Sequence, residues 1–203
     1  MKTKSRFSFA LWILLFLGLL GVRLTEAAPF AYVTGNNNTV SVIDTATNTL
    51  VGSPIPVGSQ PIGVAITPDG TRAYVTNMND NTVSVIDTAT NTIVGSPIPV
   101  GSQPIGVAIT PDGTRAYVTN NSTVTVIDTL PSSLSYNTVV STIPVGGGAV
   151  AITPDGTRAY VTNNSTVSVI DTLPSSLSYN TVVSTTPVGG GLWPSLLMGP
   201  APT

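Results

Sequence analysis

The segment Pro61-Ile-Gly-Val-Ala-Ile-Thr-Pro-Asp-Gly-Thr-Arg-Ala-Tyr-Val-Thr-Asn77 is repeated along the chain. It recurs complete at Pro104–Asn120, without its first residues at Ala149–Asn163, and as its second half at Phe30–Gly35. A second unit, Thr-Val-Ser/Thr-Val-Ile-Asp, lies between the copies and ends at Asp44, Asp87, Asp128 and Asp171. These aspartates are 43, 41 and 43 residues apart, so the chain is an array of similar units.

Each unit predicts four short β-strands, which fall in one copy at Ile62–Thr67, Arg72–Asn77, Thr82–Asp87 and about Thr92–Val100. Pro68-Asp69-Gly70-Thr71 is a turn sequence, because proline presets φ, aspartate caps the turn and glycine accepts a positive φ. Small residues suit the first strand to an inner position, while Pro97 and Pro99 mark the fourth strand as an outer edge. The second and third strands are apolar on both faces, as expected of a sheet packed between two others.

A period in the low forties with four strands per unit is typical of β-propeller blades. Paired-helix repeats have a similar period, but this chain lacks apolar residues at helical spacing. We therefore predict an all-β fold, a β-propeller of about four four-stranded blades at residues 28–60, 61–103, 104–147 and 148–191. The first unit lacks its inner strand, so an open or partial propeller is expected, with a closed four-blade ring as the alternative.

Residues 192–203 leave the repeat pattern and form an irregular tail, Leu-Trp-Pro-Ser-Leu-Leu-Met-Gly-Pro-Ala-Pro-Thr. One DNA sequence can encode this tail in one frame and the expected Ala-Val-Ala-Ile-Thr-Pro-Asp-Gly-Thr-Arg-Ala-Tyr in another. We therefore predict that the tail is a frameshifted fifth repeat and that the chain is truncated. Sequencing the codons of Gly189 to Thr203, and those beyond the stop, checks this prediction.

The first 27 residues have the pattern of a signal peptide, with a basic start and an apolar run from about Phe7 to Val22. Thr25 and Ala27 supply small residues for cleavage before Ala28. The apolar run is shorter than the roughly 20 residues that span a bilayer, which leaves a retained anchor as the alternative. We predict a secreted, periplasmic or cell-surface protein with a signal helix at residues 1–27 and no stable membrane insertion after cleavage.

The amino-acid composition lacks the residue types on which most catalytic sites depend. The chain has no histidine or cysteine, and beyond residue 27 it has three arginines, no lysine and eight aspartates. Histidine-based zinc sites, haem ligation by histidine or cysteine, and activated nucleophiles are therefore excluded from that region. Nucleic acid is a poor partner, because no basic patch could neutralise its phosphates. We predict that the protein is not an enzyme and has no catalytic, cofactor-binding or metal-binding residues.

Two sets of charged residues recur with the repeat. Arg72, Arg115 and Arg158 could form a ring of cations, but we expect each to pair with an aspartate of its own blade. The four aspartates of the Val-Ile-Asp units could line an acid–base site. An aspartate before threonine at a strand end, however, more often caps a turn through the backbone.

Two polar features are less regular. The loop Asn79-Asp80-Asn81 could contact calcium, although it lacks the further carboxylates of a dedicated calcium loop. Acceptor sequences for N-glycosylation begin at Asn37, Asn120, Asn121, Asn163 and Asn164, and they matter only in a host that glycosylates exported proteins.

The run Pro-Asp-Gly-Thr-Arg-Ala-Tyr-Val-Thr-Asn, followed by Thr-Val-Ser-Val-Ile-Asp-Thr, resembles the YVTN-family β-propeller repeat. The resemblance covers nearly everything from Phe30 to Gly191 and recurs in register. It implies four-stranded blades, usually in a ring of about seven, in exported prokaryotic proteins that include surface-layer proteins. Related propellers also include enzymes, so the resemblance leaves activity open.

The sequence thus predicts a non-catalytic exported repeat module that binds a protein or ligand, or builds cell-surface structure, through loops of adjacent blades. The expected partner is an unknown protein or surface ligand, and exposed blade ends would favour self-association. The alternative is a fragment of a lactonase-like or dehydrogenase-like propeller enzyme whose catalytic residues are missing. A degraded gene without present function is a third reading.

Overall fold

The computed structural model describes residues 30–189, in which the regular structure is β-strand arranged in four antiparallel sheets. The predicted signal helix and the irregular tail lie outside the described residues. Within them, no helix is long and apolar enough to cross a membrane. The all-β prediction is therefore confirmed for the described part of the chain.

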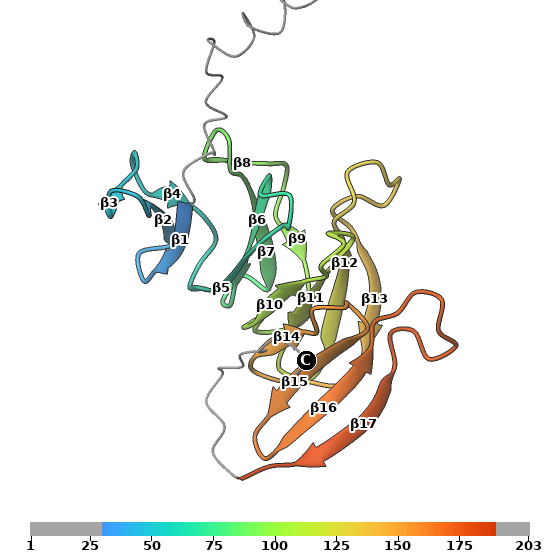
Figure 1. Cartoon of the computed structure of the whole chain (residues 1–203). Helices are drawn as coiled ribbons and strands as arrows, with labels where there is room; N and C mark the ends of the chain where they lie inside the picture. The colour runs from blue at the N-terminus through green and yellow to red at the C-terminus, as the bar shows by residue number, and fades with distance from the viewer. Residues whose placement is uncertain (1–29, 190–203) are drawn as a thin grey trace, which may run out of the picture.

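The four sheets follow one another in chain order (Figure 1). The first holds β1 (Phe30–Gly35), β2 (Thr39–Asp44), β3 (Thr49–Leu50) and β4 (Ile55–Pro56). The second holds β5 (Pro61–Ile66), β6 (Arg72–Asn77), β7 (Thr82–Asp87), β8 (Thr92–Ile93) and β9 (Ile98–Pro99). The third holds β10 (Val107–Ile109), β11 (Arg115–Thr119), β12 (Val124–Asp128) and β13 (Val139–Ile143). The fourth holds β14 (Val150–Ile152), β15 (Arg158–Asn163), β16 (Thr166–Asp171) and β17 (Val182–Pro187).

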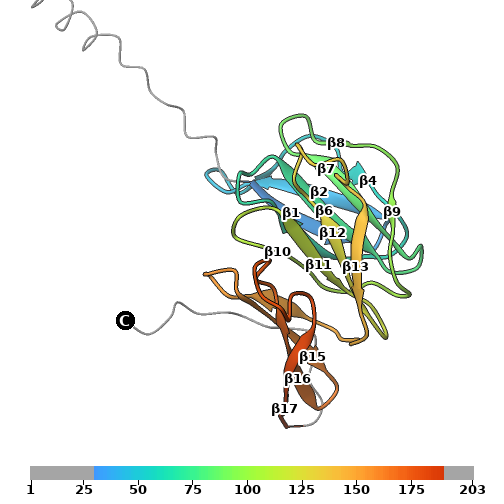
Figure 2. The same ribbon diagram turned by 90° about the vertical axis from the view of Figure 1, so that its right-hand side faces the viewer.

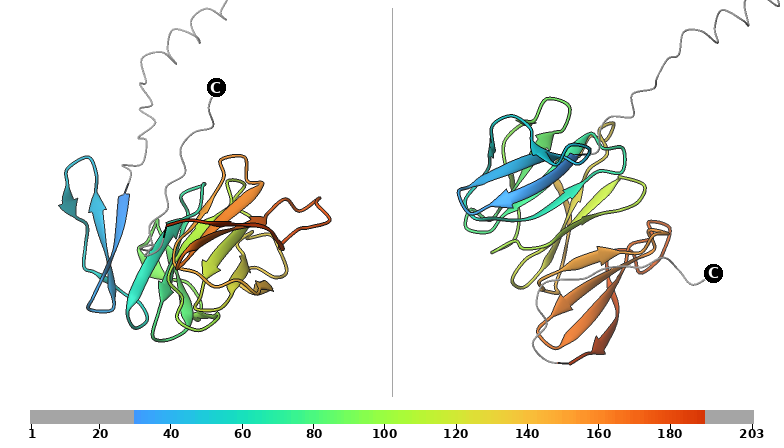
Figure 3. Two further views of the ribbon diagram at one scale, coloured as in Figure 1. Left: turned by 90° about the horizontal axis from the view of Figure 1, so that it is seen from below. Right: turned by 60° about the vertical axis from the view of Figure 1, so that its left-hand side comes forward.

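The sheets are the blades of a partial propeller. The inner strands β5, β10 and β14 contact one another in sequence, which places them along a common axis. The first sheet starts with β1, which matches the second strand of the other sheets, so its inner position is empty in the described residues, as predicted. Figure 3 shows the first and last sheets at opposite ends of the row.

The two central strands of each blade follow the sequence pattern closely. β6 and β7 have the predicted bounds, and their register sets Arg72 opposite Asp87 and Ala73 opposite Ile86. The turn before β6 has the predicted chemistry, with Gly70 at φ +72° and the Asp69 carboxylate accepting the Thr71 N–H at 3.0 Å. The turn and the alternation together fix the pairing.

The prediction of one continuous fourth strand over Thr92–Val100 is wrong. Two short strands, β8 and β9, pair separately with β7. Gly95 between them adopts φ +67°, which no extended strand allows, and Pro97 lacks the N–H that a ladder needs. The third blade has no Gly-Ser-Pro sequence at this point, and there β13 pairs with β12 as one strand with a bulge.

The core lies between the sheets rather than within one of them. Three apolar clusters each combine buried residues of two neighbouring sheets. Each cluster contains one tyrosine, which is Tyr32, Tyr74 or Tyr117. The prediction that the second and third strands are covered on both faces is confirmed for the middle sheets, where β12 is buried throughout. The last sheet differs, because every residue of β17 is exposed. Figure 2 shows this sheet below the other three.

Candidate functional site

Two kinds of connection gather at the same edge of the sheets, which we call the turn face. The Pro-Asp-Gly turns precede β6, β11 and β15, and the other connections follow β7, β12 and β16. Antiparallel pairing brings the start of each second strand beside the end of the third, so these connections meet. The turn face is therefore built from neighbouring repeats in the same way each time.

The repeated arginines are paired, as predicted. Among the described residues, the Arg Nη1–Asp distances are 2.8 Å for Arg72–Asp87, 3.1 Å for Arg115–Asp128 and 3.0 Å for Arg158–Asp171. Each of these nitrogens also donates to the carbonyl of the preceding threonine. The structure therefore joins each arginine to its own blade instead of leaving a ring of unpaired cations.

The aspartates that end the third strands cap turns, as predicted. Asp44 Oδ1 accepts the Ala46 N–H at 2.8 Å, and Asp87 Oδ1 accepts the Ala89 N–H at 3.0 Å. The aspartates of the Pro-Asp-Gly turns are held in a similar way, and the Thr67 hydroxyl and Thr71 N–H lower the pKa of the Asp69 carboxyl. These carboxylates order the backbone of their turns.

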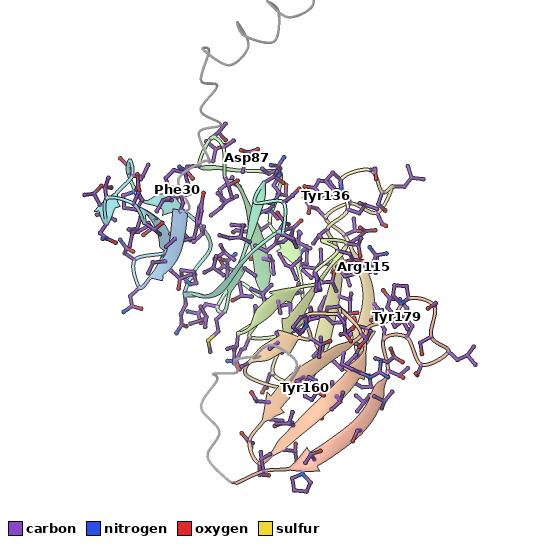
Figure 4. All side chains as sticks on the ribbon, viewed as in Figure 1. Phe30, Asp87, Arg115, Tyr136, Tyr160 and Tyr179 are labelled. Carbon is purple, nitrogen blue, oxygen red and sulfur yellow. The ribbon has the colours of Figure 1, made fainter. Side chains whose placement is uncertain are left out.

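The loops at 129–138 and 172–181 are the most organised part of the turn face. The Asp128 carboxylate accepts the Leu130 N–H at 3.0 Å, the Ser133 hydroxyl at 2.7 Å and the Ser135 hydroxyl at 2.6 Å. Asp171 holds the second loop through the equivalent contacts. Both loops project outward in Figure 1, and Figure 4 shows Tyr136 and Tyr179 near the bases of these loops.

One leucine in each loop is fully exposed. Leu134 and Leu177 have 109% of the reference accessible surface, in loops whose backbones are fixed by buried carboxylates. Single apolar residues on a surface are ordinary, but here the same residue is presented twice, one repeat apart, by the same rigid loop. This arrangement suits contact with an apolar surface.

Two hollows lie between adjacent repeats on the turn face. The larger has a volume of about 360 Å³, and its lining includes Pro68, Asp69, Arg72, Asp112, Leu130 and Pro131. The smaller has a volume of about 120 Å³, and its lining includes Pro111, Asp112, Arg115, Asp155, Leu173 and Pro174. Each hollow combines two carboxylates, one paired arginine and an apolar wall, which suits an apolar side chain next to a cationic group.

The opposite edge of the sheets has a third hollow, of about 250 Å³. It is lined by Ile105, Asn121, Gly147, Gly148, Thr162, Asn163 and Asn164. Three of the predicted glycosylation asparagines therefore lie together here and are exposed, whereas Asn120 is fully buried and donates to Thr125 at 2.9 Å. Burial removes Asn120 from the set that a modifying enzyme could reach.

The loop at Asn79–Asn81 contacts the two segments that connect its blade to its neighbours. Asp80 Oδ2 accepts the Ser59 N–H at 2.7 Å, and Asn81 Oδ1 accepts the Gln103 N–H at 2.9 Å. Between residues 30 and 189, no group of three or more acidic, histidine or cysteine residues is placed to hold a metal ion.

Sequence reasoning missed one recurring interaction. In each of the first three blades the tyrosine donates its hydroxyl to an asparagine in the next blade, at 2.7 Å in each of the pairs Tyr32–Asn91, Tyr74–Asn137 and Tyr117–Asn180. These asparagines adopt positive φ angles in the connections that follow the third strands. The recurrence of both residues in every copy was the available signal, but nothing in the sequence shows that they meet.

No family model and no curated protein match the chain. Among solved structures, hydrazine synthase from Kuenenia stuttgartiensis is 28% identical with a TM-score of 0.68, over 78% of this chain and 46% of that one. A functionally unknown protein from Desulfotomaculum acetoxidans DSM 771 is 22% identical with a TM-score of 0.68, over 81% and 55%. The chain spans about half the length of these structures. This similarity supports the propeller-like fold. The resemblance to the YVTN family rests on the sequence repeats alone.

Proposed function

We propose that the protein is a non-catalytic binding module whose turn face recognises another protein outside the cytoplasm. The observation that carries this proposal is the pair of fully exposed leucines, Leu134 and Leu177, on identical rigid loops. Export is proposed from the basic and apolar pattern of residues 1–27, which lie outside the described residues. A role in cell-surface structure is compatible with the same surface.

Rigid presentation favours binding. An apolar side chain on a loop that is already ordered loses little conformational entropy when a partner covers it. Hydrogen bonds from Ser133, Ser135 and Leu130 to Asp128 supply that order before any partner arrives. The two loops would therefore act as matched anchors, one repeat apart.

The charge of the surface indicates the chemistry of the partner. Beyond residue 27 the chain carries eight aspartates against three arginines, and each arginine is paired. The hollows beside the loops place carboxylates next to proline and leucine side chains. A protein surface with apolar residues flanked by lysine or arginine fits this combination, and its binding should weaken as salt rises.

The contacts of the acidic side chains support the proposal that the protein is not an enzyme. All eight aspartates of the described residues accept hydrogen bonds that order turns or join blades, or they pair with arginine. The chain has no histidine or cysteine, and its lysines lie at positions 2 and 4. No group of the kind that normally activates a nucleophile therefore stands in residues 30–189.

A test replaces both exposed leucines in Leu134→Ser/Leu177→Ser. Proteins cross-linked to the wild-type chain in the cell envelope of the host should be lost with this variant. The matched control is Leu50→Ser, because Leu50 is 67% exposed but lies on a short outer strand away from the loops. Equal capture by the leucine variant, or equal loss with the control, would contradict the proposal.

The second candidate is a part of a larger propeller enzyme, which the likeness to hydrazine synthase favours. In that case these blades would serve assembly, and the reacting groups would come from elsewhere. The genomic sequence around the coding region decides between the two. In-frame repeats bearing histidine or clustered carboxylates toward the axis would favour the enzyme reading.

A further inference from the structure

The three joints between neighbouring blades are built from the same contacts. Each has a tyrosine hydroxyl donating to an asparagine Oδ1 of the next blade at 2.7 Å. Each also has a threonine hydroxyl donating to a carbonyl of the next inner strand region, at 3.0 Å for Thr34–Ile62 and 2.8 Å for Thr76–Ile105. At each of these joints, one blade therefore donates the hydrogen bonds and the next blade accepts them.

The last sheet presents a donor face to which no other described blade is joined. We define this donor face by Tyr160, Val167, Val169 and Thr186. Their equivalents in the third blade, Tyr117, Val124, Val126 and Ile143, are at most 1% exposed because the fourth blade covers them. Tyr160, Val167 and Val169 are instead partly exposed, and no hydrogen bond of the Tyr160 hydroxyl is found among the described residues. Figure 4 shows Tyr160 on this sheet.

The first sheet presents the complementary acceptor face. We define it by Ala31, Val33, Ile43 and Asn48, which match the second blade's Ala73, Val75, Ile86 and Asn91. The second-blade apolar residues are fully buried against the first blade, whereas Val33 is 47% exposed. Asn48 is exposed and has φ +55°, close to the +54° of Asn91, so its side chain starts from the same backbone geometry.

We propose that the donor face of one copy of this chain binds the acceptor face of a second copy, with Tyr160 donating to Asn48 across the joint. The Tyr–Asn link and the apolar packing of the three internal joints are the template for this one, whereas the threonine contact needs an inner strand that the first described sheet lacks. Two copies joined at both ends would place their eight described blades in one ring, a number within the four to eight blades usual for propellers. This proposal goes beyond the binding role of the turn face and does not depend on it.

One sequence difference between the repeats makes the proposed joint weaker than the internal joints. Residues 109–147 and 152–190 differ at two positions, Thr125/Ser168 and Ile143/Thr186. Ile143 is buried at the internal joint, and Thr186 takes its place on the exposed donor face. A threonine there buries less apolar surface than isoleucine, so the joint between copies is weaker than the joints within one chain.

The first experiment measures the mass of the purified chain by light scattering and sedimentation over a range of concentrations. The expected species is a dimer that dissociates on dilution. Thr186→Ile should lower its dissociation constant about tenfold or more, because the isoleucine restores the buried contact. Ser168→Thr, the other difference between the two repeats, is the matched control and should change nothing. A monomer for both wild type and Thr186→Ile, or growth into open polymers, overturns the proposal.

A charge exchange tests which faces meet. Val33→Asp alters the acceptor face and Val169→Lys alters the donor face, and both positions are partly exposed, so each variant should fold. Each alone should weaken the homodimer. A mixture should dimerise again, because one joint is then wild type and the other pairs aspartate with lysine. The proposed pairing is overturned if the mixture dimerises no more than the single variants do, although the circular dichroism of each variant is native.

The loop variant separates this proposal from the function of the turn face. Leu134→Ser/Leu177→Ser should leave the dimer unchanged, since neither leucine lies on the donor or acceptor face. Tyr160→Phe, which removes only a hydroxyl, should weaken the dimer and leave partner capture by the leucines measurable. If the leucine variant dissociates the dimer and Tyr160→Phe does not, the copies meet through the loops and the proposal is wrong.

Discussion

At the scale of single residues, the tyrosine of the Arg-Ala-Tyr-Val-Thr segment links packing to order between blades. Tyr117 is fully buried, its hydroxyl reaches Asn180 at 2.7 Å, and the two residues are 63 positions apart. Burial, together with the neighbouring Tyr179, raises the pKa of Tyr117, so the phenol stays a protonated donor throughout the ordinary pH range. One side chain thus fills the core and sets the rotation of the next blade.

Tyr117→Phe is expected to lower the free energy of unfolding by about 1 kcal/mol, since it removes one hydrogen bond and leaves the Asn180 oxygen without that donor. Urea unfolding followed by circular dichroism measures the change. Tyr160→Phe is the matched control, because no hydrogen bond of that hydroxyl is found in residues 30–189. In protein dilute enough to keep copies apart, the control should stay near wild type. Equal losses in both variants would show that the hydroxyl contributes through something other than the joint.

At the scale of elements, the loop at 172–181 folds around one carboxylate. The hydroxyls of Ser176 and Ser178, the Leu173 N–H and Arg158 lower the pKa of Asp171 to about 2. The ordinary value is 3.8, so the ionised form is favoured in the folded state. Stability from this group is therefore fully present above about pH 4 and is lost as the pH falls through the folded pKa.

We expect acid to loosen this loop between about pH 4 and pH 2, with Asp171→Asn abolishing that part of the pH dependence. Ser176→Ala/Ser178→Ala keeps the carboxylate but removes the two largest favourable hydrogen bonds. The folded pKa of Asp171 then lies closer to 3.8, so the loss of stability on acidification should be smaller and should end at a higher pH than in the wild type. Unfolding free energies measured at several pH values test this, and an unchanged profile in the double-alanine variant would refute the assigned cause.

The elements also show what sequence alone could and could not predict. β6 and β7 were predicted to the residue because their alternation and the Pro68–Thr71 turn are local signals. The split of the fourth strand depends on the positive φ of Gly95, which the sequence permits but does not require. The Tyr–Asn links and the hollows lie between blades, so they depend on how one sheet rotates against the next, and no local pattern specifies that rotation.

At the scale of the whole molecule, burial falls from the middle blades toward the ends of the described chain. β7 is buried at four central positions and β12 throughout, whereas β2 and β16 alternate between buried and partly exposed residues. Full burial of one valine is worth about 1.5–3 kcal/mol, and Val126 has it where Val169 does not. In a repeat array each unit is stabilised mainly by its neighbours, so the end blades should open more easily.

Amide hydrogen exchange in dilute protein should reveal this gradient. The backbone amides of β7 and β12 should exchange roughly tenfold or more slowly than those of β16, since about 1.4 kcal/mol of local stability gives a factor of ten. Val126→Ala should erase the advantage of β12 over β16, because it removes apolar contact at an internal joint, while Val169→Ala should change protection little. Uniform protection across all four blades would instead mean that the array unfolds as a single cooperative unit. Protection of β16 that rises with protein concentration would locate the region covered when copies associate.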